Sequence, residues 1–445
     1  MKNSTKILGA IGIIVVVVFV AFLFCNKFYP ANKTALGINP FNNGGRERNM
    51  IVVLSDLHLG ADLAYAEFNK NTPSLQKLLK QINESPNVKE LVIGGDLLDE
   101  WFVPATVNTY AGKDQRDFVQ RIATANKGVI DEFNNIIKSG KILVTYVPGN
   151  HDLTIKAENI DLILPGINQA RDEEQGLGTY SPSDYPKIAI EHGHRYNFFC
   201  APDPISNQDI APGTIMPPGY FFTRIAALHI LEKYSQPGDT MKVVTPNVSG
   251  DESQKMLFAY WKLWEWTVDN LPIKEKLDDK IIITNVDGFT QTYAVNDLIP
   301  YQLKAGGRLD VNLYKGIQDT WDQRQILNKV PVNIPVAQAI ANASSVEETD
   351  NQAKAQYFMN PNSDKRIVIF GHTHVAKIIP SNNYKGEKSI YANSGTWIDH
   401  NPNLTTTNFV VITPQNAKAS SQTTVKLYNF QGEVATKMAE DFLRY

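Results

Sequence analysis

Short apolar runs that end abruptly in polar residues alternate with amphipathic segments in the first third of the chain. The runs are continuous and rich in valine, isoleucine and leucine, which is typical of strands buried on both faces. They span residues 50–55, 91–93 and 142–147. Thr72-Pro73 predicts a helix with Thr72 as its N-cap, because apolar residues follow at helical spacing through Ile82. A second amphipathic segment spans 114–138. This alternation predicts an α/β fold with a parallel sheet and crossover helices.

Later runs continue the pattern at 187–191 and 366–370, and shorter strands are predicted at 389–392, 409–413 and 424–429. Five of the strands end in a cluster of aspartate, asparagine or histidine. Six of the eight histidines lie in these clusters, which chance placement does not explain. Ligands of open α/β sheets bind at the carboxyl ends of strands, so the clusters predict one site at that edge. Their polar residues are Asp56, His58, Asp96, Asn150, His151, Asp152, His192, His194, His372 and His374.

Carboxylates and imidazoles without a thiolate suit hard to borderline divalent ions such as Mn, Fe, Zn or Co. The ligand candidates are too many for one ion, so we expect two ions bridged by Asp96. They are Asp56, His58, Asp96, Asn150, His192, His372 and His374. Two metals about 3.5–4 Å apart clamp the attacking and leaving oxygens of an in-line displacement and lower the pKa of a bridging water. This chemistry predicts hydrolysis of a phosphate ester or pyrophosphate by a bridging hydroxide.

Residues beside the ligands have predicted roles of their own. His151 is adjacent to a ligand and is expected to face the substrate, where it protonates the leaving oxygen or stabilises charge on the phosphoryl group. Asp99 and Asp152 are expected to orient the ligands.

The ordered motifs D-x-H, G-D-x-x-D, G-N-H-D, H-G-H and G-H-T-H resemble those of the calcineurin-like metallophosphoesterase family. The resemblance covers 50–194 and 366–413. It implies a four-layer αββα sandwich of two mixed sheets, with the metal pair at the carboxyl edge. By position it also implies one metal on Asp56, His58, Asp96 and His374, and another on Asp96, Asn150, His192 and His372. His151 takes the position of the family's catalytic histidine. His194 is not usually a ligand in the family, so it is a lesser candidate that could contact substrate.

Within the family, the stretches SDLHLG, GDLLDEW and YANSGTW resemble most the branch of the UDP-2,3-diacylglucosamine pyrophosphohydrolases. That resemblance implies a lipid-linked or nucleotide-linked substrate. Those enzymes commonly carry arginine where this chain has His151, and their nucleotide-lipid substrate is cytosolic. The branch is therefore an analogy, and the substrate stays open.

The two parts of the predicted core span 50–200 and 366–445, and 165 residues separate them. This insertion, 201–365, is predicted to hold helices at 221–234, 256–271 and 336–358, and a hairpin at 280–295 turning at Asp287-Gly288. It is either a structural elaboration or a mixed α/β cap that selects substrate. On the second helix, Trp261 and Trp264 lie on one face, and both side chains are predicted to pack into the core of the insertion. Trp266 lies on another face and is the candidate for substrate contact.

The N-terminal segment 1–26 contains nineteen residues without a charge, 7–25, preceded by two lysines. This length predicts an uncleaved membrane anchor, with the body of the protein outside the cytoplasm. A lipoprotein acylated at Cys25 is the alternative. Residues 27–49, rich in Asn, Gly and Pro, are predicted to be a linker.

Composition bounds the remaining partners. The chain has 445 residues, a net charge of −3 and no basic stripe, so no nucleic-acid partner is expected. Apart from Cys25 only Cys200 is present, which leaves the body of the protein no internal disulfide. Two alternatives to the dimetal phosphoesterase stay open: a catalytically silent binding scaffold and a nucleic-acid phosphodiesterase. The pattern does not specify an oligomeric state.

Overall fold

The computed structural model describes residues 39–172, 176–233, 237–343, 345, 348–402, 404–415 and 422–444. Residues 39–445 form one compact unit. The predicted anchor at 7–25, Cys25 and the first part of the predicted linker therefore lie outside the described residues. In the described part of the chain, no helix combines the length and apolar character needed to cross a bilayer.

The larger sheet has the strand order β15-β14-β13-β1-β2-β3-β4. Strands β1 to β4 run parallel, whereas β13 pairs antiparallel with β1 and is followed by two further antiparallel strands. The bounds are β1 Met50–Leu54, β2 Val88–Gly94, β3 Leu143–Val147, β4 Asn168–Gln169, β13 Asn408–Thr413, β14 Thr423–Gln431 and β15 Val434–Leu443. The C-terminal strands thus complete a sheet that the N-terminal strands begin.

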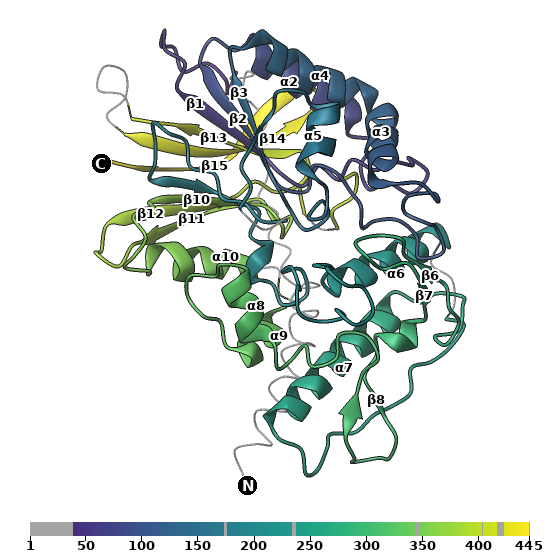
Figure 1. Ribbon diagram of the computed structural model, residues 1–445. Helices are drawn as coiled ribbons and strands as arrows, with labels where there is room; N and C mark the ends of the chain where they lie inside the picture. Colours follow the sequence, from purple (N-terminus) through teal and green to yellow (C-terminus); the bar gives the residue numbers. More distant parts are fainter. Residues whose placement is uncertain are drawn as a thin grey trace. The chain divides into compact units, whose positions relative to one another are not determined.

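The smaller sheet has the order β11-β12-β10-β5 and is also mixed. Its strands are β5 Ile188–Ile190, β10 Ile367–Phe370, β11 Lys377–Asn382 and β12 Lys388–Asn393. Alternate residues of both sheets, such as Val53 and Ile369, share one buried cluster, so the sheets pack face to face (Figure 1). The α/β fold with two mixed sheets confirms that part of the prediction.

Helices cover the outer faces of this sandwich. On the larger sheet, side chains such as Val52 and Ile93 point away from the smaller sheet and pack against helix residues such as Leu78 and Phe133. These helices are α2 Thr72–Glu84, α3 Gln115–Ala125, α4 Lys127–Ser139 and α5 Ala157–Ile163. On the smaller sheet, α10 (Glu348–Ala353) and the π-helical turn η3 (Lys354–Phe358) contact β10, β11 and β12. Residues 348–358, which the sequence assigns to the insertion, therefore cover the sandwich.

Two helix predictions needed correction. Asn71 rather than Thr72 is the N-cap of α2, and its side chain binds the carbonyls of Trp397 and Ile398 instead of capping the helix. The predicted segment 114–138 is two helices, because Asn126 leaves helical geometry and its amide donates to the carbonyls of Gly60 and Ile122.

The insertion contains α6 Gly219–Leu231, α7 Glu252–Asn270, η2 Val295–Asp297, α8 Trp321–Leu327, α9 Val336–Asn342 and the hairpins β6–β7 and β8–β9. The strands of these hairpins are β6 Ile282–Ile283, β7 Thr292–Tyr293, β8 Tyr301–Gln302 and β9 Leu309–Asp310. The β6–β7 hairpin was predicted, and its turn uses positive φ at both Asp287 (51°) and Gly288 (86°). The prediction of a single helix at 336–358 is wrong, since α9, α10 and η3 are separate elements.

The insertion and the sandwich share one continuous hydrophobic cluster. In α7, Trp261 and Trp264 are buried, and Trp264 stacks on Phe222 of α6 at 4.0 Å. Trp266 is 43 % exposed, as its different helix face predicts. Because the cluster has no break at the junction, we expect insertion and sandwich to unfold together.

Arg224 of α6 links the insertion to the sandwich by hydrogen bonds. Its side chain is fully buried, and its guanidinium donates to Thr109 Oγ1 and Tyr220 Oη and to five backbone carbonyls. The carbonyls belong to Val103, Pro104, Ala105, Val107 and Ile283. One side chain thus joins the loop after β2, helix α6 and the β6–β7 hairpin.

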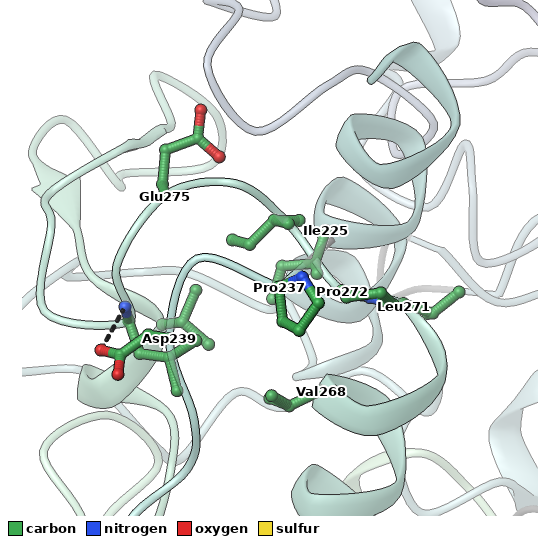
Figure 2. Close-up of a pocket in the computed structure, with 10 residues that line it drawn as sticks. Ile225, Pro237, Asp239, Val268, Leu271, Pro272 and Glu275 are labelled. Atoms are coloured by element: carbon green, nitrogen blue, oxygen red, sulfur yellow. Dashed lines mark hydrogen bonds between the residues drawn. The ribbon is translucent and has the colours of Figure 1, made fainter. Parts of the chain in front are cut away.

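Figure 2 shows a small pocket inside the insertion, between α6, α7 and the segment that follows α7. Ile225 and Val268 line it, and Asp239 at its rim accepts a hydrogen bond from the backbone of Leu277. Its volume of about 10 Å³ is enough for roughly one water molecule. The pocket is therefore a packing defect of the insertion core.

Residues 39–49, predicted as linker, pack against the sandwich. Phe41 is buried and stacks on Phe409, and Ser85 donates to the Phe41 carbonyl. The side-chain amide of Asn87 donates to the carbonyls of Gly45 and Glu47. The Asn- and Gly-rich composition here supplies turns that are fixed to the fold.

Candidate metal centre

The loops after β1, β2, β3, β5 and β10 bring the sequence-predicted ligands to one edge of the sandwich. The backbone is unusual there, because five of the residues have positive φ although none is glycine. They are Asp56 (53°), His58 (51°), Asp96 (51°), His372 (70°) and His374 (58°). Such conformations are disfavoured for residues with a Cβ and accumulate where function requires them.

Glycines in the motifs make room for the ligands of other motifs. A Cβ on Gly95 would lie 2.3 Å from Nδ1 of His192, and one on Gly149 would lie 2.1 Å from Oδ1 of Asp96. Each of these distances is far below a normal contact between non-bonded atoms. The motifs therefore interlock, which explains why glycine precedes the polar residues.

The first group of ligand atoms comes from Asp56, His58, Asp96 and His374. One atom from each residue lies within 4.8 Å of the others. Nε2 of His58 is 3.1 Å from Nε2 of His374 and 3.6 Å from Oδ2 of Asp96, while Nε2 of His374 is 3.2 Å from Oδ1 of Asp56. Bonds of 2.0–2.2 Å to one ion place neighbouring ligand atoms roughly 3–3.5 Å apart, so these spacings suit a shared cation.

The second group comprises Asp96, Asn150, His192 and His372. Nε2 of His192 is 3.1 Å from both Oδ2 of Asp96 and Oδ1 of Asn150. Nδ1 of His372 lies 2.8 Å from the same Asn150 oxygen. Asp96 belongs to both groups, as expected of a bridging carboxylate.

Hydrogen bonds on the far sides of the rings identify the atoms available to a cation. Nδ1 of His58 lies 3.0 Å from Oδ2 of Asp99, and Nδ1 of His192 lies 2.9 Å from the carbonyl of Gly94. In a neutral ring these contacts hold the proton on Nδ1, so both Nε2 atoms point lone pairs at carboxylate and amide oxygens. Nε2 is therefore the atom that each ring could offer to a cation, and this donor set fits one.

The carboxylates in this centre are ionised despite complete burial. Burial alone would raise the pKa of Asp96, but the nearby rings of His192, His151 and His58 outweigh it and hold the pKa well below its usual range. The pKa of Asp56 is lowered for the same reason, with burial opposed by His192 and His374. The centre thus offers negative charge in a water-poor site, which favours a cation.

His151 lies beside the ligands without joining either group. Its Nδ1 is 2.8 Å from Oδ1 of Asp99, its backbone N–H donates to Oδ1 of Asp96, and its side chain is 12 % exposed. The ring stacks on Trp101 with 4.9 Å between ring centroids. With Nδ1 directed at Asp99, Nε2 is the ring atom available to a substrate.

Asp99 and Asp152 both position the site, in different ways. Asp99 binds the rings of His58 and His151 through its two oxygens. Asp152 accepts from the backbone N–H groups of Leu97, Leu98 and Gly149, and so fixes the loops that carry Asp96 and Asn150. Burial, followed by repulsion from Asp96, raises the pKa of Asp152 to about 6.

His194 lies apart from the ligand groups. It is 2 % exposed, and its Nε2 is 2.6 Å from the carbonyl of Gly176. Burial, together with the positive field of His192 and His372, lowers its pKa well below 6.5. This environment favours a neutral ring that supports the loop over one that contacts a substrate.

Sequence reasoning did not identify Glu67 or Trp101. Oε2 of Glu67 lies 3.6 Å from Nδ1 of His58, and Glu67 forms a second titratable group with His58, Asp99 and His151. The histidine atoms facing Asp99 carry protons in this arrangement, so the second group is a hydrogen-bonded network around the centre. Glu67 belongs to none of the motifs. Trp101 ends the stretch GDLLDEW, but the sequence analysis gave it no role of its own.

Residues 50–221 match the sequence profile of the calcineurin-like phosphoesterases. This stretch is a calcineurin-like phosphoesterase domain. A comparison with curated proteins finds no match. The calcineurin-like phosphoesterase domain contributes β1 to β5 and their ligand loops, and the strands after residue 366 complete both of its sheets.

The profile match and the buried His/Asp groups together support a metallophosphoesterase domain at residues 50–221, with side chains that could hold metal ions. Phosphoester hydrolysis is accordingly the activity the domain implies. The profile covers a whole family and supports no particular branch, so the resemblance to the pyrophosphohydrolases stays a prediction.

Proposed function

We propose that this protein is a dimetal phosphoester hydrolase acting on a phosphate ester or pyrophosphate. The observation that carries the proposal is the position of Asp96, whose Oδ2 is 3.1 Å from Nε2 of His192 and 3.6 Å from Nε2 of His58. A carboxylate between two groups of lone pairs suits the bridge of a dinuclear centre.

The residues proposed to hold the first ion are Asp56, His58, Asp96 and His374, and those for the second are Asp96, Asn150, His192 and His372. Divalent ions held there would polarise a phosphoryl oxygen and activate a water for attack on phosphorus. Manganese is the metal we would use in assays, because carboxylate, amide and imidazole ligands all suit it. Iron and zinc fit the same donor set.

His151 has the role of proton donor to the leaving oxygen in this proposal. Asp99 holds its Nδ1, which leaves Nε2 facing outward with a partly exposed ring. Burial lowers its pKa, but Asp99 and Asp96 outweigh that effect and raise the pKa above 6.5. A ring held in one orientation and charged near neutral pH is suited to protonate an alkoxide.

Contacts around Trp101 support a substrate-selecting role for the insertion. Trp101 stacks on His151 and makes an edge contact with Tyr220 of α6 at 6.3 Å. The ring of Trp101 therefore connects Tyr220 of the insertion to His151, the proposed proton donor. A lipid-linked or nucleotide-linked phosphate would suit an apolar boundary of this kind, and Trp266 stays a predicted contact for it.

The test is a substrate panel on residues 39–445 loaded with Mn, Fe or Zn. Aryl phosphate monoesters, diesters and a pyrophosphate are compared, with metal content measured on the same samples. Two equivalents of metal with hydrolysis of at least one class support the proposal. Asp131→Asn, at an exposed position on α4, is the matched control for ligand variants. Tight metal binding without hydrolysis of any class would favour the scaffold alternative.

A further inference from the structure

The far end of the insertion exposes aliphatic side chains to an unusual degree. Leu303 is 95 % exposed, Val248 is 89 % and Val243 is 82 %. All three belong to two short segments, 242–248 and 301–308, which we call the insertion tip. Figure 1 shows its β8 hairpin at the end of the insertion, away from both sheets. Grouped apolar side chains in water are a cost that soluble surfaces normally avoid.

Hydrogen bonds hold the two segments of the insertion tip together. The Gln302 side chain donates to the carbonyl of Thr245 at 2.9 Å, and Thr245 Oγ1 accepts from the N–H of Gly306 at 2.7 Å. The N–H of Val248 donates to the carbonyl of Gly306 at 3.2 Å. Val248 and Leu303 are thus presented by one fixed surface.

The insertion tip is also basic. Lys242, Lys304 and Arg308 are exposed within the two segments, which contain no aspartate or glutamate. Among the nearest acids along the chain, which lie outside the segments, Asp239 is half-buried, and Asp251 and Asp310 are exposed. Apolar side chains ringed by cations are complementary to the headgroup region of an anionic bilayer, where cations meet lipid phosphates and aliphatic groups enter the acyl boundary.

We propose that the insertion tip docks on an anionic lipid membrane. A second copy of the chain is a poorer occupant, since a two-fold contact through this patch would face three cations with three cations. Protein interfaces are usually anchored by tryptophan, tyrosine and arginine side chains in well-packed pockets. The most exposed apolar side chains of the tip are instead aliphatic, and its one aromatic residue, Tyr301, is 38 % exposed.

The N-terminal sequence is compatible with the same membrane. Residues 26–38 connect the predicted apolar anchor to Asn39, and thirteen extended residues span at most about 45 Å. The proposed docking does not depend on the proposed hydrolase activity.

The test uses residues 39–445, because this compact unit contains every strand of both sheets and both hydrophobic clusters of the described chain. Its partition onto phosphatidylcholine vesicles with about 30 % phosphatidylglycerol is measured by co-sedimentation. The variant V243S/V248S/L303S should bind at least about tenfold more weakly, since three aliphatic groups no longer leave water. Thermal unfolding should be unchanged, because the positions are exposed.

Ile326→Ser is the matched control, because Ile326 is 75 % exposed on α8 outside the tip and should leave binding unchanged. A charge variant, K242Q/K304Q/R308Q, should lose about fivefold in affinity per cation on anionic vesicles and little on pure phosphatidylcholine. Added salt should mimic it.

Three results would overturn the proposal. The first is failure of the wild-type unit to bind anionic vesicles. The second is an equal loss of binding in Ile326→Ser and in the triple serine variant. The third is wild-type self-association, abolished by the serine variant without lipid, which would assign the tip to a second copy. None of these readouts involves hydrolysis, so they are independent of the metal centre.

Discussion

Replacing Arg224 by methionine should destabilise the whole unit of residues 39–445. Methionine approximates the volume of the arginine stem but offers no donor, so the seven acceptors around the guanidinium lose their common partner. Some of them keep another donor: the carbonyl of Pro104 accepts from Val107 N, and that of Ala105 accepts from Ile283 N.

The size of the loss in stability follows from the acceptors that are left without any donor. Among the described residues, the carbonyls of Val103 and Val107 accept hydrogen bonds only from Arg224. A buried polar group without a hydrogen-bond partner costs about 1–3 kcal/mol. The two carbonyls together therefore predict a decrease of roughly 2–6 kcal/mol in the free energy of unfolding. Arg224→Lys keeps the charge but has three donors in place of five, and should fall between wild type and methionine.

The assay is urea unfolding followed by tryptophan fluorescence and far-ultraviolet circular dichroism. Both probes should report one coincident transition, because the insertion and the sandwich share one hydrophobic cluster. Arg116→Met, exposed on α3, should change stability by less than about 0.5 kcal/mol. A loss below about 1 kcal/mol in Arg224→Met, or separate transitions for the two probes, would refute the junction reasoning.

Four further outcomes are expected. Asp96→Asn should lose both metal equivalents whereas Asp56→Asn weakens one site, and two full equivalents retained by Asp96→Asn would rule out bridging. His151→Ala should keep its metals and lose ~10²–10⁴-fold in turnover, less for aryl esters with good leaving groups; an equal loss for all esters would make it a phosphate binder. Burial raises the pKa of Glu100 from 4.5 to about 7, so the folded protein keeps a proton that the unfolded chain loses and stability falls as pH rises through this window. Glutamine does not titrate. The free energy of unfolding of Glu100→Gln minus that of wild type should therefore be about 2.5 kcal/mol larger at pH 8 than at pH 5, as measured by urea unfolding at both values. Trp266→Ala should raise KM for the natural substrate without changing kcat on a small aryl phosphate, and an unchanged KM would remove it from the substrate site.

The sandwich strands and their polar ends were predictable because local signals coincide there. A buried strand needs a continuous apolar run, and a ligand in a tight loop needs a neighbouring glycine. The run before Gly95 and Asp96 shows both features. The strand β15, with an exposed outer face, lacked an apolar run and was not predicted.

The junction and the surroundings of the metal centre were not predictable, for a different reason. Arg224 and Glu67 act through partners that are remote in sequence or lack a spacing rule, as in the 121 positions between Arg224 and Val103. The sequence alone does not distinguish a buried arginine from an exposed one. The break at Asn126 likewise depends on its bond to the carbonyl of Gly60, which periodicity does not encode.

The order of the strands has a consequence for synthesis on the ribosome. Strand β5 pairs with β10, and residues 191–366 lie between them in the chain. At a synthesis rate of roughly 5–20 residues per second, about 9–35 s would pass between the synthesis of β5 and that of β10. The interval between β1 and its neighbour β13 would be longer. During that time apolar strand edges are open to wrong partners. A fragment ending at residue 221 would keep those edges permanently unpaired and should aggregate, even though it contains the whole profile match.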